Sequence, residues 1–192
     1  DLGKTGLEER VKGSDLRVLP VTISEKGDER IPLVPQRISA GYTEGYSDSE
    51  FIEQLPQFNL PFPEMHSGRS YRLFQTKGDS ILPVPSGAYI ISEYLEDWRD
   101  LKNSNRYVIV SKDEGIVFKR AQNYLHKGYL ELHSDNKSYE PYSIEAENIF
   151  EIWKALGFIS FEWPDNESGT SEFEITSLVT QLKKEVDRLK QV

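Results

Sequence analysis

The chain has 192 residues and a formal net charge of −9; 37% of its residues are hydrophobic and 29% are charged. This length suits one domain of ordinary size with appendages. The acidic balance excludes a chain that binds DNA tightly by itself, because its only basic clusters are Lys119-Arg120 and Lys183-Lys184. No apolar run of ~20 residues could span a membrane, and no secretory signal opens the chain.

The sequence contains no cysteine, which excludes disulfides, thiolate nucleophiles and cysteine-ligated zinc. The absence fits a reducing compartment, and we expect a cytoplasmic protein. None of the three histidines, His66, His126 and His133, has the spacing of a metal ligand or lies beside a nucleophile elbow. We therefore expect no metal, no cofactor and no Ser-His-Asp triad.

The first part of the chain, residues 1–33, is predicted to be a linker or arm. It begins without Met and is polar and dotted with glycine up to Ser14, so we expect it to continue a longer protein. An edge strand is predicted over Leu16–Ser24 because Pro20 would interrupt a central one. The stretch "IPLVPQRISAGY" is predicted to be extended, since its two prolines block a helix. A short helix is expected next, capped by Asp48 or Ser49 and stopped by Pro56.

From Gly68 the pattern is typical of a mainly β body. Short runs rich in Val, Ile, Tyr and Phe are separated by turn signals at the spacing of a barrel or sandwich. The predicted strands are "SYRLFQTK", "AYIISEYL", "RYVIVSK", "GIVFKRAQ", "GYLELHS" and "NIFEIWKALGFISFEW". Gly115 and Gly128 are expected to form hairpin turns.

Residues 161–192 are predicted to be a linker followed by an amphipathic helix. Its apolar residues follow steps of four and three: Ile175, Val179, Leu182, Val186 and Leu189. β-branched residues at one heptad position and mainly Leu at the other favour a parallel two-stranded coil. The helix could also pack on its own domain. We favour self-association, because a linker separates the helix from the β body.

The triplet "GDS" at residues 78–80 leaves open whether Ser80 is a turn hydroxyl or a nucleophile. Without a suitable Cys or His, a nucleophilic serine needs a carboxylate or a lysine as its base. A lysine can act as a base when burial lowers its pKa. Lys119 follows the apolar residues of "GIVFKRAQ" and is the best candidate, although a single lysine in a strand more often reaches solvent.

A serine–lysine enzyme also needs a substrate. The loop "ISAGYTEGY" offers the bond between Ala40 and Gly41, whose small side chains would let a nucleophile approach the backbone. The same loop could equally be a flexible connector. The intervals from Gly41 to Ser80 and from Ser80 to Lys119 are equal, at 39 residues each (80 − 41 and 119 − 80).

Together these segments resemble the LexA-like self-cleaving repressors of serine peptidase family S24. That family has an Ala-Gly bond, then a G-D-S-M-x-P segment, then a strand ending in V-x-K-R; here they read Ala40-Gly41, "GDSILP" and "VFKR". A later segment, "LHSDNKSYEPYSI", matches the family at Ser134, Asn136, Tyr139 and Pro141. Ile81 replaces the usual Met, and Ser86 and Ala88 replace the acidic residues around Gly87. The resemblance covers residues 34–160.

The resemblance implies a bent β-barrel or sandwich, as in LexA and signal peptidases, and a homodimer. It also implies that Ser80 is the nucleophile and Lys119 the base for cleavage of Ala40–Gly41, with Gly78, Asp79, Ile81 and Pro83 supporting the site. DNA would be bound by an upstream helix-turn-helix, and an activating co-protease could trigger cleavage. Two alternatives stay open: a dimerisation domain with an unused dyad, and a membrane signal peptidase, which the absence of an apolar anchor disfavours.

Overall fold

The computed structural model describes residues 19–23, 29–65, 68–162 and 183. The chain divides into two units, Asp1–Ser160 and Phe161–Val192, and almost all described residues belong to the first. The predicted heptad residues Ile175, Val179, Leu182, Val186 and Leu189 lie outside the described residues, so the coiled-coil hypothesis stays a prediction.

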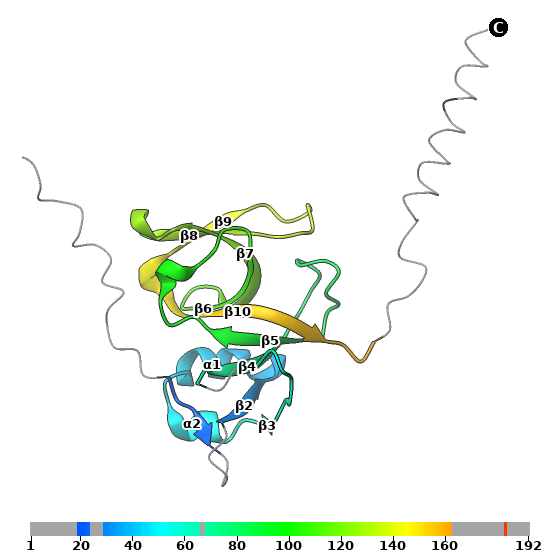
Figure 1. Cartoon of the computed structure of the whole chain (residues 1–192). Helices are drawn as coiled ribbons and strands as arrows, with labels where there is room; N and C mark the ends of the chain where they lie inside the picture. The colour runs from blue at the N-terminus through cyan, green and yellow to red at the C-terminus, as the bar shows by residue number, and fades with distance from the viewer. Residues whose placement is uncertain (1–18, 24–28, 66–67, 163–182, 184–192) are drawn as a thin grey trace, which may run out of the picture. The chain divides into compact units, whose positions relative to one another are not determined.

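In the described residues, ten strands form one connected sheet in the order β1-β2-β4-β5-β10-β6-β7-β8-β9, and β3 pairs with β2. The sheet runs from β2 and β3 through β5 and β10 to β8 and β9, with a strong curve in β7 (Figure 1). The strands are β1 (Thr22–Ile23), β2 (Glu29–Val34), β3 (Gln57–Phe58), β4 (Tyr71–Gln75), β5 (Tyr89–Tyr94), β6 (Arg106–Ser111), β7 (Gly115–Tyr124), β8 (Tyr129–His133), β9 (Tyr142–Glu145) and β10 (Ile149–Ile159).

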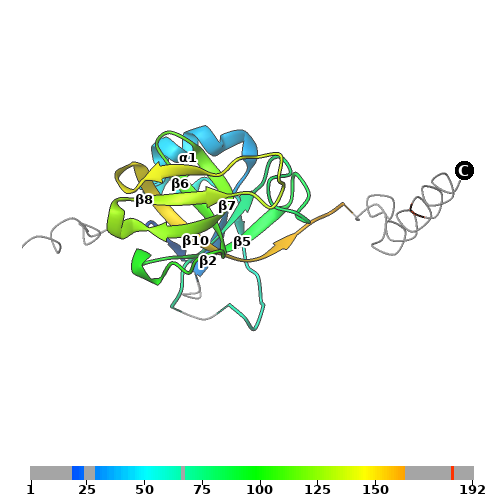
Figure 2. The same ribbon diagram turned by 90° about the horizontal axis from the view of Figure 1, so that it is seen from above.

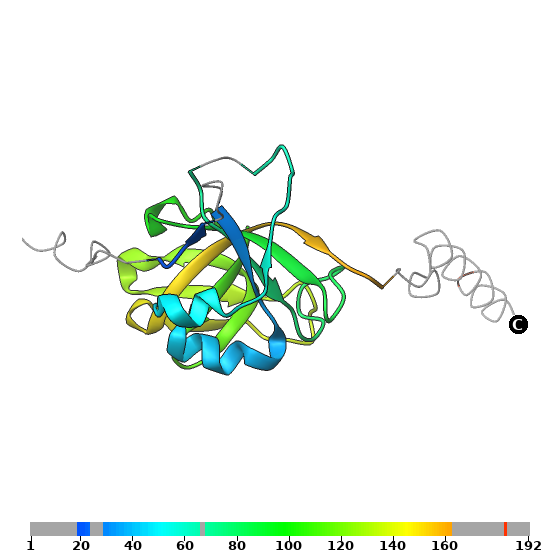
Figure 3. The ribbon, with the colours of Figure 1, turned by 90° about the horizontal axis from the view of Figure 1, so that it is seen from below.

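Short helices connect these strands. They are η1 (Gln36–Ile38), α1 (Ser39–Gly45), α2 (Ser49–Glu53), η2 (Trp98–Asp100), η3 (Leu125–Lys127) and η4 (Ala146–Asn148). Asp48 caps α2 as predicted, because its carboxylate accepts the backbone N–H of Glu50 at 2.9 Å. Seen from below, the two α-helices lie across one side of the sheet (Figure 3).

The central strands β6 and β10 separate two apolar cores, which explains their near-continuous hydrophobic sequence. Side chains on a strand alternate between its faces, so Val108 belongs to the first core and Ile109 to the second. Likewise Trp153 of β10 contributes to the first core and Ile152 to the second. Seen from above, β6, β7 and β8 lie close to β10, in agreement with the strand order (Figure 2).

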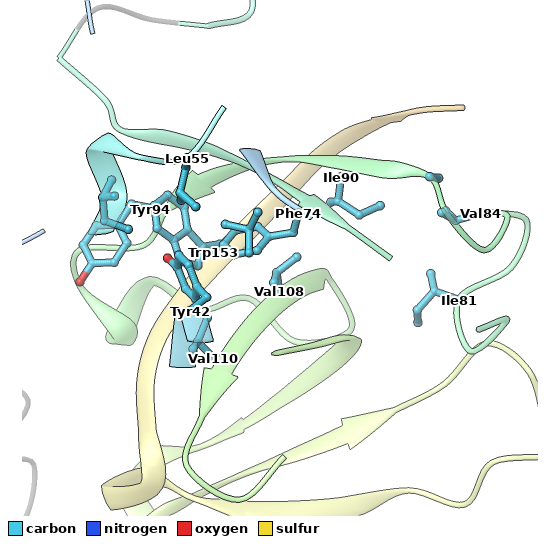
Figure 4. Close-up of a cluster of buried hydrophobic side chains, with 13 residues drawn as sticks. Tyr42, Leu55, Phe74, Ile81, Val84, Ile90, Tyr94, Val108, Val110 and Trp153 are labelled. Carbon is cyan, nitrogen blue, oxygen red and sulfur yellow. The ribbon is translucent and has the colours of Figure 1, made fainter. Parts of the chain in front are cut away.

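The first core connects α1 with the turn that follows β4. It extends from Tyr42 of α1, past Phe74 and Trp153, to Ile81 and Val84 of that turn (Figure 4). All of these side chains are buried. The turn carrying the "GDS" triplet is therefore anchored in the apolar interior by the residue directly after Ser80.

A charged network lies inside this core. Arg72 and Glu151 are only 1% and 3% exposed, and Arg72 Nη1 lies 3.2 Å from Glu151 Oε1. Glu151 also accepts hydrogen bonds from Tyr42 Oη at 2.6 Å and Trp153 Nε1 at 3.0 Å, while Arg72 donates to Tyr42 Oη. Burial raises the pKa of Tyr42 well above its ordinary value, so this hydroxyl stays neutral. The network fixes α1 to β4 and β10.

The mainly β fold class is confirmed, and so are the six predicted strands after Gly68 and the hairpin turns at Gly115 and Gly128. The strands β1 and β3, of two residues each, and β9, of four residues, are shorter than the others. Strands β3 and β9 were not predicted. The prediction of an extended chain through Ala40 and Gly41 is wrong, because both residues lie in α1. In the described part of the chain, no helix is long and apolar enough to cross a membrane.

Candidate active site

Ser80 lies in the turn between β4 and β5. Gly78 adopts φ +82°, a conformation that glycine accepts readily, and its N–H donates to Ser86 Oγ at 3.0 Å. Ser80 is partly buried, and its hydroxyl donates to the carbonyl of Phe118 at 3.4 Å. Among the described residues, no acceptor takes the backbone N–H of Ser80 or Ile81. These two N–H groups are free to bind a negatively charged oxygen.

Lys119 lies on β7, opposite Tyr107 of β6, and is 9% exposed. Its Nζ donates to Ser134 Oγ at 2.8 Å. No carboxylate of the described residues lies within ion-pair distance of Nζ. Burial lowers the pKa of Lys119, and the more distant charges of Glu114 and Asp79 oppose this only in part. The amine is therefore closer to its neutral, basic form than an exposed lysine is.

A third segment, residues 134–139 after β8, holds the serine turn. The backbone N–H groups of Asp135 and Asn136 donate to the Ser80 carbonyl at 2.7 and 3.2 Å. The side chains of Asn136 and Tyr139 donate to the Asp79 carboxylate at 2.8 and 2.7 Å. The hydrogen bond from Tyr139 is the main cause of the lowered pKa of Asp79. Asp79 is thus a charged acceptor that ties two loops together.

Ser80 and Lys119 line one cavity of about 210 Å³. Its other walls come from the serine turn, from the first half of β7 and from Tyr139, and they include the apolar side chains of Ile81, Val84, Ile116, Val117 and Phe118. Lys119 Nζ lies 5.2 Å from the centroid of the Tyr139 ring. A hydroxyl and an amine of lowered pKa in one cavity are suited to acyl transfer, in which an amine can serve as the base for a serine nucleophile.

The structure brings Ser80 and Lys119 into the same cavity but does not join them by a hydrogen bond. Lys119 Nζ donates to Ser134 Oγ, and Ser80 Oγ donates to the carbonyl of Phe118. The sequence motif matched Ser134, Asn136 and Tyr139 to the family but assigned them no role. In the structure, Ser134 contacts Lys119, and Asn136 and Tyr139 contact Asp79. The matching segment was the only signal in the sequence that pointed to Ser134.

The four residues expected to support the site have different surroundings. Gly78 and Asp79 shape and tether the turn, as described above. Ile81 is 2% exposed and packs in the first core, so it fills the place of the usual Met as an apolar anchor. Pro83 is exposed and follows a cis peptide bond from Leu82.

The structure does not bring Ala40 and Gly41 to the cavity. Both are exposed residues of α1, and no residue of α1 lines the cavity. Thr43 of α1 lies beside Gly115 at the start of β7, four residues before Lys119. At the ordinary rise of a strand this is about 13 Å along β7. Tyr42, directly after the Ala40–Gly41 bond, holds the helix in this position through Arg72 and Glu151.

In the described ranges, no group of three His, Cys, Asp or Glu residues could hold a metal ion.

The Peptidase S24-like family model matches residues 32–156, which include the serine turn, the strand of Lys119 and the segment that contacts both. The match covers more than half of the chain. The chain therefore belongs to the Peptidase S24-like family, as its sequence motifs indicated. A search of curated proteins gave no match.

Proposed function

We propose that this chain is the regulatory domain of a transcriptional repressor, and that it cleaves its own Ala40–Gly41 bond with Ser80 as nucleophile and Lys119 as base. The observation that carries the proposal is the buried Lys119 amine, which shares a cavity with Ser80 and hydrogen-bonds to a neutral hydroxyl instead of a carboxylate. Burial lowers the pKa of such an amine, so it gives up its own proton more readily than an amine in an ion pair does. The neutral form can then accept the proton of Ser80.

The reaction is an acyl transfer within one chain. Lys119 Nζ takes the proton of Ser80 Oγ while Oγ bonds to the carbonyl carbon of Ala40. The negatively charged oxygen that develops can bind the free N–H groups of Ser80 and Ile81. The bond to Gly41 then breaks, the new amine receives the proton from Lys119, and water hydrolyses the ester on Ser80.

Cleavage requires a change of structure around Ala40. The backbone of α1 must unwind, because the nucleophile needs access to a carbonyl that is engaged in a helix. The segment must also move along β7 toward Lys119. The buried contacts of Tyr42 with Arg72 and Glu151 oppose this movement, so they would restrain the chain from cleaving itself.

The proposal includes partners. A homodimer formed by this domain and by the C-terminal helix predicted from the sequence would hold two upstream DNA-binding domains on one operator in the cytoplasm. Cleavage would separate those domains from the dimer, and affinity for DNA would fall because the gain from linkage is lost. An activating co-protease would act by favouring the cleavable conformation.

The test is self-cleavage of the purified chain at alkaline pH, followed by mass spectrometry. We expect two fragments that meet at Ala40–Gly41, no fragments from Ser80→Ala or Lys119→Ala, and normal cleavage by the control Ser138→Ala, whose serine lies on an exposed part of the 134–139 loop. Cleavage that persists in both dyad variants would contradict the proposal.

A second candidate function is a regulatory and dimerisation domain whose dyad is unused. Two observations favour it: Ala40 and Gly41 lie in a helix outside the cavity, and Lys119 hydrogen-bonds to Ser134 instead of Ser80. A chain that stays intact at every pH, also with an activating partner, would support this candidate over self-cleavage.

A further inference from the structure

A cluster of three charged side chains lies beside the cavity. Arg106 of β6 and Arg120 of β7 are paired on these adjacent strands, and both contact Asp135. Arg106 Nη2 lies 3.1 Å from Asp135 Oδ2, and Arg120 Nε donates to Asp135 Oδ1. Arg120 is held in turn by the carbonyl of Ser104, at 2.7 Å from Nη1.

Asp135 is the best buried member, with 18% of its side chain exposed against 37% and 32% for Arg106 and Arg120. Burial alone would raise its pKa, but the hydrogen bonds from Arg120 and Arg106 outweigh this and the pKa is lowered. The carboxylate is charged at neutral pH, and it links the 134–139 loop to two neighbouring strands.

The backbone around this carboxylate contacts both members of the dyad. The N–H of Asp135 donates to the Ser80 carbonyl at 2.7 Å, and the hydroxyl of the preceding Ser134 accepts from Lys119 Nζ at 2.8 Å. A shift of Asp135 would therefore move the nucleophile's own backbone and the lysine's partner together.

We propose that Asp135 is a positioning residue of the Ser80–Lys119 site, and that Arg106 and Arg120 clamp its carboxylate so that the 134–136 backbone fixes Ser80 and Lys119 relative to each other. The inference rests on the proposed function. It explains why three partly exposed charges gather beside the cavity, since ion pairs of this kind contribute little to stability. A displacement of about 1 Å at a catalytic group, in contrast, can cost ~10²-fold in rate.

The inference is tested on the full chain with two readouts: the rate of self-cleavage and the rate at which a sulfonyl fluoride labels Ser80, followed by mass spectrometry between pH 7 and 11. In labelling, Ser80 Oγ bonds to sulfur, fluoride leaves and Lys119 takes the proton, so this readout does not require α1 to move. We expect Asp135→Asn to reduce both rates about 10- to 100-fold. The midpoint of its pH profile should rise, because a loosened 134–136 segment admits water to Lys119.

The matched control is Asp97→Asn. Asp97 also pairs with an arginine, Arg99, but the pair is exposed and lies outside the cavity, so both rates should be unchanged. Arg120→Gln should slow both rates, and the double variant Arg120→Gln/Asp135→Asn should be no slower than Asp135→Asn alone, because both changes release the same clamp.

Wild-type rates and an unshifted midpoint in folded Asp135→Asn would overturn the inference. If that variant does not fold, wild-type rates and an unshifted midpoint in Arg120→Gln would overturn the inference instead. The variant Ser80→Ala separates failure of this inference from failure of the proposed function. Loss of cleavage and labelling in Ser80→Ala with normal rates in Asp135→Asn refutes the clamp alone. Labelling of Ser80 without cleavage of Ala40–Gly41 refutes self-cleavage, and the labelling rates still test the clamp.

Discussion

Arg72 and Lys119 are both buried cations, but their partners differ. Arg72 faces a carboxylate, Glu151, and also donates to Tyr42 and to the carbonyl of Pro20. Lys119 has the hydroxyl of Ser134 and the face of an aromatic ring. A cation paired with a carboxylate keeps its proton and can connect the elements that carry the pair. Burial without a counter-ion lowers the pKa of an amine, so the amine loses its proton more readily. The first site therefore stabilises α1, and the second is suited to proton transfer.

The largest effect is expected from Arg72→Met. Removal of one partner of a buried ion pair leaves Glu151 uncompensated, and such changes cost about 3–5 kcal/mol of unfolding free energy. Urea denaturation measures the loss. The control is Arg69→Met, whose ion pair with Glu93 is half exposed and should contribute far less. Equal losses of unfolding free energy in the two variants would contradict the view that the buried Arg72 pair stabilises the fold.

A smaller effect of a different kind is expected from Tyr42→Phe. The lost hydroxyl bridges Arg72 and Glu151, so unfolding free energy should fall by about 1–3 kcal/mol. Self-cleavage should become faster, because α1 detaches more easily. The control Tyr46→Phe keeps the ring stacked on Phe150 and removes a hydroxyl that has no hydrogen-bond partner among the described residues. Slower cleavage in Tyr42→Phe would mean that the network does not restrain the substrate segment.

The smallest effect is expected from Lys119→Met, which should stabilise the chain. The pKa of Lys119 is lower in the folded chain than in the unfolded one, so its burial costs stability at pH values below the folded pKa. The cost fades as the pH rises toward the unfolded value near 10.4. We expect the melting temperature at pH 7 to rise by about 2–4 °C, the change that ~1 kcal/mol produces in a domain of this size. The gain should disappear above about pH 10.5.

The exposed Lys112 gives the control for that comparison, since Lys112→Met should leave the melting temperature nearly unchanged at both pH values. A destabilised Lys119→Met chain at pH 7 would indicate that the ammonium form is favoured by its surroundings.

The two regions also differ in how far the sequence could predict them. Runs such as "RYVIV" predict buried strands directly, because both faces of β6 are covered and every residue of the run is apolar or aromatic after Arg106. The helix at Ala40 could not be predicted in this way. Its glycines disfavour a helix locally, and it is stabilised by the contacts of Tyr42 with residues 30 and 109 positions away, which no local pattern reveals.

At the candidate site, Ser80 and Lys119 could be proposed because short motifs carry them, and the structure places both in one cavity. Their surroundings depend on strand register. The pairing of Arg106 with Arg120, and the return of the 134–136 backbone to Ser80, become visible only when β6, β7 and β8 are aligned in the sheet. A motif thus identifies the reacting groups, while the tertiary structure identifies the residues that position them.

The central claim is that neutral Lys119 activates Ser80 against Ala40–Gly41. The most direct measurement is the rate at which a new N-terminus at Gly41 appears as a function of pH. The rate should rise with pH and level off at a midpoint below the ordinary lysine value near 10.4, because burial lowers the pKa of Lys119. A rate that rises in proportion to hydroxide concentration without levelling off, and that is the same in Ser80→Ala, would contradict the account.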